Sequence, residues 1–141
     1  MDVLRHIKLL SVVAEDVIPV GHARLAAALF YRSKVVAIGY NQYKSHPFAA
    51  KYSKNPDAIY LHAEADAINK AKKKLTEQEL KKCTLIVTRV KQNVHKKLEI
   101  GIAKPCSGCQ QCIEDHGIKT VIYTEDSSFK KIKFTTEISD D

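Results

Sequence analysis

Residues 105–123 read PCSGCQQCIEDHGIKTVIY, and this stretch predicts a helix followed directly by a buried strand. Pro105 suits the entry to a helix, because the N–H that it lacks has no partner in the first turn. Gly117 is a typical residue just beyond a helix end, where the backbone often turns left-handed. The β-branched and aromatic residues Thr120–Tyr123 are typical of a strand. A helix that is followed directly by a buried strand indicates an α/β domain.

A second helix and strand precede this stretch. The spacing of apolar residues predicts a helix over 58–75, and Thr84–Val90 has the composition of a strand. Thr76 and Glu79 have the spacing of a capping box, which would begin one further helical turn. The intervening segment 92–104 is basic and irregular, and we expect either a strand extension or a flap there.

The N-terminal part predicts one more helix and a hairpin. Apolar residues recur along 3–18 at intervals of four, three, four and three, which is one face of an amphipathic helix, and Pro19 and Gly21 close it. Two short apolar runs, Leu25–Tyr31 and Val35–Tyr40, are joined by three residues and predict an antiparallel pair of strands.

The remaining segments complete a single domain over residues 1–141. Residues 42–57 are polar, contain two prolines and predict a long loop of the kind that is often functional. Phe129–Thr136 predicts a last edge strand, and 138–141 an acidic, frayed tail. The order α-β-β-α-β-α-β predicts a three-layer α-β-α architecture with one mixed sheet of about five strands.

Composition excludes several classes of protein. Apolar residues make up 45% of the 141 residues and charged residues 28%, which argues against a disordered chain. No apolar run approaches the roughly 20 residues that cross a bilayer, and no secretory signal is visible, so we expect a cytoplasmic protein without membrane contact. The net charge of +7 is spread evenly along the chain, which permits an anionic partner without requiring one.

The cysteines indicate metal or redox chemistry. Three of the four cysteines, Cys106, Cys109 and Cys112, fall within seven residues, which is unlike a disulfide framework in a chain without a signal. Cys106 and Cys109 are three residues apart at a helix start, so both sulfur atoms face one side. With His62 they supply the nitrogen and sulfur ligands that zinc prefers. The helix N-terminus favours their thiolate forms.

Three protein ligands indicate a catalytic rather than a structural zinc site. They leave a fourth position for water, whose pKa zinc lowers toward about 7. Glu64 follows His62 by two residues and can exchange protons with that water without binding the metal. The alternative is a closed structural site with Cys112 as the fourth ligand. On a helix Cys112 lies about 240° around the axis from Cys106, so we expect it in the core, and Cys83 likewise.

These residues resemble the cytidine and deoxycytidylate deaminase superfamily. The resemblance rests on His62-Ala63-Glu64, on Pro105-Cys106-Ser107-Gly108-Cys109 and on Gly39-Tyr40-Asn41, and it spans about Gly21 to Thr124. The histidine ligand is more similar to the deoxycytidylate and tRNA-adenosine branches, and Lys44 to Pro47 is similar to small phage deaminases. The resemblance implies a cytidine deaminase-like fold, a zinc ion (Zn2+), hydrolytic deamination and a homo-oligomer.

The resemblance also implies substrate contacts. Asn41 matches the family asparagine that hydrogen-bonds the sugar, although asparagine is also common in turns after strands. Ala63 would offer backbone groups to the base edge. His22 lies just before the first strand and is either near the pocket or an ordinary surface histidine. Tyr43 and Lys44 belong to a mixture of aromatic and cationic residues that suits base stacking and phosphate contact, or equally a solvated loop.

We therefore expect a zinc-dependent hydrolase that converts deoxycytidylate to deoxyuridylate and releases ammonia, with Glu64 as the catalytic residue. The first alternative is a deaminase that acts on a base within single-stranded DNA or RNA, including tRNA. The second is a non-catalytic zinc-binding or nucleic-acid-binding module, against which Glu64 argues, since such a module needs no carboxylate beside its metal.

Overall fold

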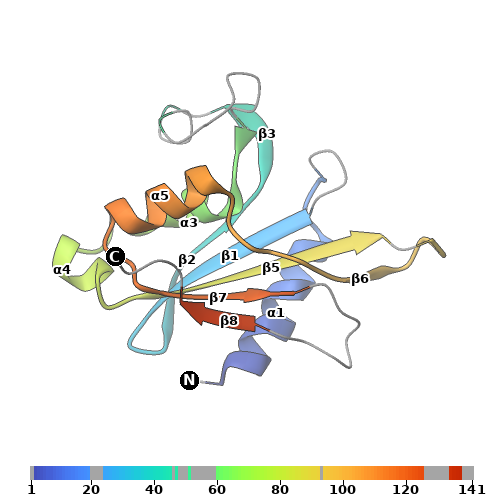
Figure 1. The fold of residues 1–141 in the computed structure, drawn as a ribbon, viewed down its shortest axis with the longest axis horizontal. Coiled ribbons are helices and arrows are strands. Elements are labelled where there is room, and N and C mark those ends of the chain that lie inside the picture. Colours follow the sequence, from blue (N-terminus) through green and yellow to red (C-terminus); the bar gives the residue numbers. More distant parts are fainter. Residues whose placement is uncertain are drawn as a thin grey trace.

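The computed structural model describes residues 2–19, 24–45, 47, 51, 60–92, 94–125 and 134–137 of the chain (Figure 1). Its helices are α1 (Val3–Glu15), α3 (Ala63–Ala71), α4 (Glu77–Leu80) and α5 (Ser107–Asp115). Its strands are β1 (Arg24–Tyr31), β2 (Lys34–Tyr40), β3 (Gln42–Ser45), β4 (Tyr60–Leu61), β5 (Thr84–Gln92), β6 (Leu98–Gly101), β7 (Thr120–Thr124) and β8 (Phe134–Glu137).

One mixed sheet forms the middle layer. Its strand order is β2-β1-β5-β7-β8, and β6 also pairs with β5. β5 and β7 are parallel and every other pair is antiparallel. β7 and β6 occupy successive parts of the same edge of β5, and Thr124 bridges them by donating to the Gly101 carbonyl at 2.8 Å. The predicted three-layer α/β fold with a mixed sheet is confirmed.

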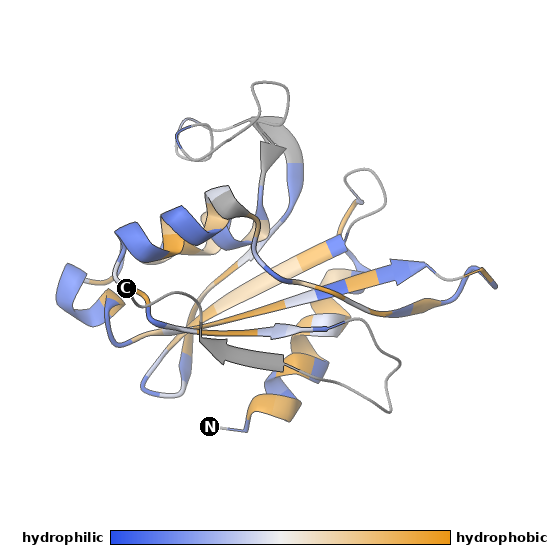
Figure 2. Cartoon of the chain, viewed as in Figure 1, coloured by the Kyte–Doolittle hydropathy of each residue, from blue (hydrophilic) through white to orange (hydrophobic). Residues whose placement is uncertain are grey.

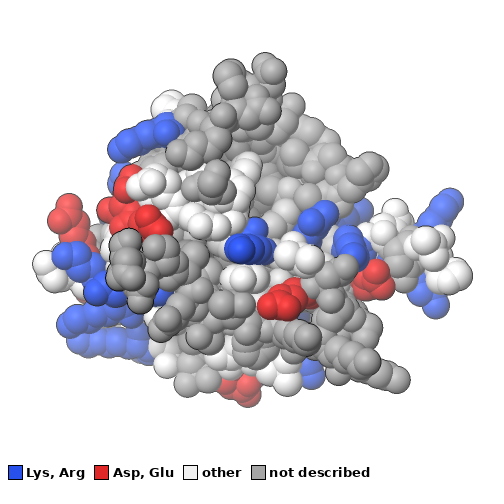
Figure 3. Space-filling view, viewed as in Figure 1, with Lys and Arg blue, Asp and Glu red and all other residues white. Residues whose placement is uncertain are grey.

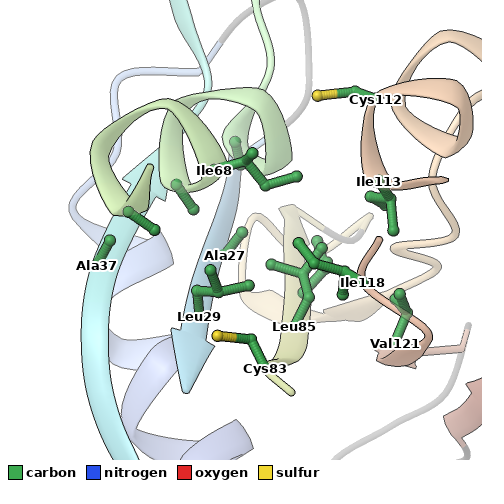
Figure 4. Close-up of a cluster of buried hydrophobic side chains, with 14 of the residues drawn as sticks. Ala27, Leu29, Ala37, Ile68, Cys83, Leu85, Cys112, Ile113, Ile118 and Val121 are labelled. Atoms are coloured by element: carbon green, nitrogen blue, oxygen red, sulfur yellow. The ribbon is translucent and has the colours of Figure 1, made fainter. Parts of the chain in front are cut away.

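The sheet buries a different core on each face. Alternate residues of β1 point to opposite sides, as the period of a strand requires. Ala26, Ala28 and Phe30 pack with α1 in one cluster, whereas Ala27 and Leu29 pack with α3 and α5 in the other. Figure 4 shows the second cluster, and Figure 2 shows hydrophobic central strands, with α5 carrying hydrophilic residues along much of its length and α1 many hydrophobic ones.

Gly39 lets β2 and α3 approach closely. A Cβ atom built on Gly39 would lie less than 3.0 Å from the carbonyl oxygen of Ala63, from the nitrogen of Ala67 and from the Cβ of Asp66. Real Cβ atoms essentially never come so near, so glycine is required wherever strand and helix backbones touch in this way. The contact fixes the first turn of α3 against the end of β2.

The second helix differs from its predicted bounds of 58–75. It begins at Ala63 and ends at Ala71, because Tyr60 and Leu61 instead form β4, which pairs with β3. β3 likewise occupies the start of the predicted loop at 42–57. The predicted capping box is confirmed, since the hydroxyl of Thr76 accepts from the Glu79 N–H at 3.1 Å and the Glu79 carboxylate accepts in return.

The other bounds follow the predictions more closely. The strand predicted over Thr84–Val90 extends by two residues to Gln92, and the rest of segment 92–104 contains β6, a separate strand that pairs antiparallel with the far end of β5 and was not predicted. The third helix begins at Ser107, after Cys106 as its N-cap residue, rather than at Pro105. The last strand covers Phe134–Glu137, whereas the start of its predicted range and the predicted tail lie outside the described residues.

Candidate metal centre

The starts of two helices meet on one face of the sheet. His62 is the N-cap residue of α3 and Cys106 is the N-cap residue of α5. Both helices pack over the same hydrophobic cluster and contact each other. Each cap residue has an extended backbone, so its side chain leaves the helix at the end where backbone N–H groups are free. The fold therefore brings residues 62 and 106 together, although 44 positions separate them.

Three ligand atoms converge at this point. The Nδ1 atom of His62 lies 3.2 Å from the Sγ atom of Cys109 and 3.6 Å from that of Cys106. All three atoms lie within 4.8 Å of one another. Zinc bonds of about 2.0–2.1 Å to nitrogen and about 2.3 Å to sulfur at tetrahedral angles would separate nitrogen from sulfur by about 3.6 Å. The donor set and its spacing fit a zinc site.

The two thiols carry unequal proton affinities. The Sγ atom of Cys106 accepts from the backbone N–H of Cys109 at 3.5 Å, as an N-cap group does. Hydrogen bonds from the Cys109 thiol and from His62 lower the pKa of Cys106 to about 3. The same hydrogen bond to Cys106, together with burial, raises the pKa of Cys109. The lowered pKa of Cys106 therefore comes mainly from these side-chain hydrogen bonds, and the thiolate preference predicted for both cysteines does not extend to Cys109.

Glu64 is buried beside these ligands. It lies in the first turn of α3 and is 3% exposed. Burial raises the pKa of its carboxyl, and a hydrogen bond with the Cys109 side chain opposes that rise. Within the described ranges, the group of side chains able to hold one ion consists of His62, Cys106 and Cys109, so Glu64 is adjacent to the ligand set without joining it.

The other two cysteines belong to the core, as predicted. Cys112 is fully buried, and its side chain points from α5 toward α3 (Figure 4). Its Sγ atom lies 4.0 Å from the Nδ1 atom of His116. Cys83 is 2% exposed and donates to the Glu79 carbonyl at 3.4 Å. A closed site with Cys112 as fourth ligand finds no support in this arrangement.

The predicted substrate contacts differ in how far the structure describes them. Ala63 is buried at the first position of α3. Asn41 is 7% exposed, and its Oδ1 atom accepts from the Leu25 N–H at 2.9 Å, so part of its amide stabilises the start of β1. Tyr43 and Lys44 lie in β3, where the structure describes the backbone alone, and His22 lies outside the described residues. Their contacts with substrate stay predictions.

Sequence reasoning missed Asp66. This carboxylate is 5% exposed on α3 and accepts from the backbone N–H of Tyr40 and from the side chains of Gln42 and Lys70. The available signal was its position in the apolar run Ala65-Asp66-Ala67-Ile68, where a charged side chain that is buried with the helix needs polar partners.

The fold and the three-ligand set fit a family of zinc-binding proteins. The model of the family described as "Cytidine and deoxycytidylate deaminase zinc-binding region" matches residues 3–125, so the chain belongs to that family. A search of curated proteins finds no match. No helix among the described residues is long and apolar enough to span a membrane.

Solved structures share the fold. The dCMP deaminase of cyanophage S-TIM5, in its apo form, has a TM-score of 0.52 and 19% identity over 90% of this chain and 82% of that one. The structure of that enzyme in complex with dCMP and dUMP has a TM-score of 0.52 and 21% identity, over 88% of this chain and 79% of that one. Cytidine deaminase from Burkholderia pseudomallei has a TM-score of 0.61 and 18% identity, over 96% of this chain and 93% of that one. The cytidine deaminase-like fold is therefore shown.

Proposed function

We propose that the chain is a zinc-dependent hydrolase that converts the 4-amino group of a cytosine nucleotide to a carbonyl, with deoxycytidylate as substrate and deoxyuridylate and ammonia as products. The observation that carries the proposal is the three-ligand set of His62, Cys106 and Cys109 with the buried Glu64 beside it. Three protein ligands leave a coordination position open, which distinguishes catalytic from structural zinc sites.

Each of these side chains has a distinct task. His62, Cys106 and Cys109 would hold the metal, which when bound supplies Lewis acidity that makes water a nucleophile near neutral pH. Glu64 would take a proton from the attacking water and pass protons to the ring nitrogen and to the departing amino group. One C–O bond forms, one C–N bond breaks, and the nitrogen leaves as ammonia. Glu64 is 3% exposed, and this burial would restrict the movement of its carboxylate.

Deoxycytidylate is the preferred substrate for two reasons. The family includes deoxycytidylate deaminases, and the cyanophage enzyme of the same fold was solved with dCMP and dUMP. On the face in Figure 3, described Lys and Arg side chains are spread over the left, the middle and the right of the view, with acidic side chains among them. A mononucleotide needs contact with a single phosphate, which such a mixed surface can supply.

The test compares Glu64→Ala with wild type. Glu114→Ala is the matched control, because Glu114 is an exposed carboxylate on α5. Ammonia and uridine nucleotide release are measured with dCMP, and zinc by elemental analysis. We expect about one zinc per chain in all three proteins and a loss of at least about 10²–10⁴ in rate for Glu64→Ala alone. An active Glu64→Ala protein would refute the mechanism, and an inactive wild type would favour a binding module.

A substrate panel separates monomer from polymer. We expect dCMP to be converted faster than deoxycytidine, and short single-stranded oligonucleotides to be poor substrates. For a single-stranded polymer, the logarithm of the binding constant falls against the logarithm of the salt concentration with a slope of about −0.7 per phosphate contact. The binding constant of a mononucleotide should depend only mildly on salt. Efficient turnover of oligonucleotides with untouched free nucleotides would assign the chain to the polymer-acting alternative.

We further propose that residues 1–141 act as one deaminase domain within a cytoplasmic homo-oligomer. Exposed apolar side chains on α1 support self-association, since Leu9 is 56% and Val12 is 59% exposed. Sedimentation equilibrium of wild type and of a Leu9→Lys variant measures the mass. A monomeric wild type at micromolar concentration would contradict the oligomer.

A further inference from the structure

A buried carboxylate on α3 accepts hydrogen bonds from the residues before and after Asn41. The Oδ2 atom of Asp66 accepts from the Tyr40 N–H at 3.2 Å, from Gln42 Nε2 at 3.2 Å and from Lys70 Nζ at 3.1 Å. A buried carboxylate is costly unless hydrogen bonds compensate its lost hydration. Here two of the three donors come from the residues on either side of Asn41, so the compensation ties that segment to the helix.

Asn41 is held from its other side by β1. Its backbone N–H donates to the Leu25 carbonyl at 3.3 Å, and its Oδ1 atom accepts from the Leu25 N–H at 2.9 Å. Gln42 then lies opposite Leu61 in the β3–β4 pair, and Leu61 directly precedes His62. The segment Tyr40 to Gln42 is therefore fixed to the sheet, to the residue before a metal ligand, and through Asp66 to α3.

We propose that Asp66 is a positioning residue that sets Asn41 against the metal centre, so that the sugar and the reacting base carbon of one nucleotide are placed together. The inference rests on the proposed function. Asp66 lies on the same helix as Glu64, and His62 caps that helix, so its hydrogen bonds transmit the position of these groups to Tyr40 and Gln42. Misplacing a substrate-holding group by about 1 Å can cost about 10²-fold in rate.

A purely stabilising ion pair would account for the Lys70 contact alone. The side chain of Lys70 is 42% exposed, and such partly exposed pairs contribute little. Lys70 also donates to the Ile38 carbonyl at 3.1 Å, so it has a second role along the edge of β2. The donors from Tyr40 and Gln42 are the ones that define the position of Asn41, and they separate positioning from simple pairing.

The experiment compares three variants with the zinc-loaded wild type. Asp66→Ala removes all three hydrogen bonds. Asp66→Asn keeps a neutral oxygen acceptor, which binds donors more weakly than a carboxylate. Lys70→Ala is the matched control, because it removes the ion pair, the hydrogen bond to the Ile38 carbonyl and the cation–π contact with the Tyr40 ring, but leaves the Tyr40 and Gln42 donors in place. Zinc content, KM and kcat for dCMP, and hydrogen exchange of the Tyr40 and Leu25 amides are measured for each.

We expect a graded series with zinc retained throughout. KM for dCMP should rise by about 10–100-fold in Asp66→Ala and by about 3–10-fold in Asp66→Asn, with kcat changed less and Lys70→Ala close to wild type. Exchange of the Tyr40 amide should accelerate in the same order, as its acceptor weakens. If Asp66→Ala fails to fold, Asp66→Asn and Gln42→Ala test the proposal in its place, because Gln42→Ala removes one of the same hydrogen-bond donors.

Two results would overturn the proposal. Unchanged KM in the folded Asp66 variants would show that the Asn41 segment keeps its position without the carboxylate. Loss of zinc in Asp66→Ala would assign the residue to metal retention instead. A wild type that acts on no nucleotide refutes the proposed function separately, and the Tyr40 and Leu25 exchange rates then decide whether Asp66 orders this segment. In that case, unchanged hydrogen exchange of these two amides in both Asp66 variants would refute the inference.

Discussion

Replacing Gly39 by alanine should damage both stability and catalysis through one close contact. The added Cβ would lie about 1 Å inside the 3.4 Å at which ordinary contact begins with the backbones of Ala63 and Ala67. Backbone atoms cannot rotate away, so α3 has to retreat from β2. Overpacking of this kind costs about 1–3 kcal/mol, and contact with backbone on the helix side places Gly39→Ala near about 3 kcal/mol.

The same displacement reaches the site, because Ala63 lies between His62 and Glu64. A shift of about 1 Å in these groups should lower kcat/KM by about 10²-fold. Urea unfolding of zinc-saturated protein and dCMP turnover are the measurements. Gly101→Ala is the matched control, since its Cβ would meet flexible side-chain atoms of Lys91 and Arg89 at 3.3–3.5 Å. If Gly39→Ala unfolds at the same urea concentration as Gly101→Ala and keeps full activity, the reasoning about this contact is wrong.

Three further outcomes follow from the cysteines and from the start of α1. In zinc-free protein at pH 7, Cys106 should be alkylated first, because its pKa is lowered to about 3. Burial raises the pKa of Cys83 to about 11 and that of Cys112 to about 12, so both should react more slowly. Peptide mapping after iodoacetamide treatment measures this order, and bound zinc should abolish the alkylation of Cys106. Cys112→Ser should keep its zinc but lose about 1–3 kcal/mol of unfolding free energy through a buried hydroxyl, and loss of metal would contradict its core role. Asp2→Ala should cost about 1 kcal/mol in urea unfolding, because the Asp2 carboxylate caps α1 by accepting from the Arg5 N–H at 3.1 Å; an unchanged midpoint would count against that cap.

Local patterns in the sequence predicted most of the fold. The spacing of Ile7, Leu10 and Ala14 predicted α1, and these residues are buried against the sheet. The hairpin of β1 and β2 followed from two apolar runs and a three-residue connection. The zinc-fitting set of His62 and the two cysteines followed from chemistry, because few combinations of residues supply nitrogen and sulfur ligands at two helix starts.

Long-range pairing explains what the sequence did not predict. The helix predicted from residue 58 begins at Ala63, because Tyr60 and Leu61 pair with β3, and no local pattern encodes a partner so far along the chain. Asp66 is a similar case. Its three donors come from Tyr40 on β2, Gln42 on β3 and Lys70 on α3, so its role depends on the finished fold.

The two helix starts that meet at the candidate metal centre belong to distant parts of the chain. Cys106 lies 44 residues after His62, and α3, α4, β5 and β6 lie between them. An ion bound to both would therefore cross-link the chain. Closing a loop of this length removes unfolded-state entropy worth about 4 kcal/mol, if a metal cross-link follows the same loop-length relation as a disulfide. That is a sizeable share of the about 5–15 kcal/mol by which native domains are stable. The concentration of available zinc would then determine the stability of the folded chain as well as its chemistry.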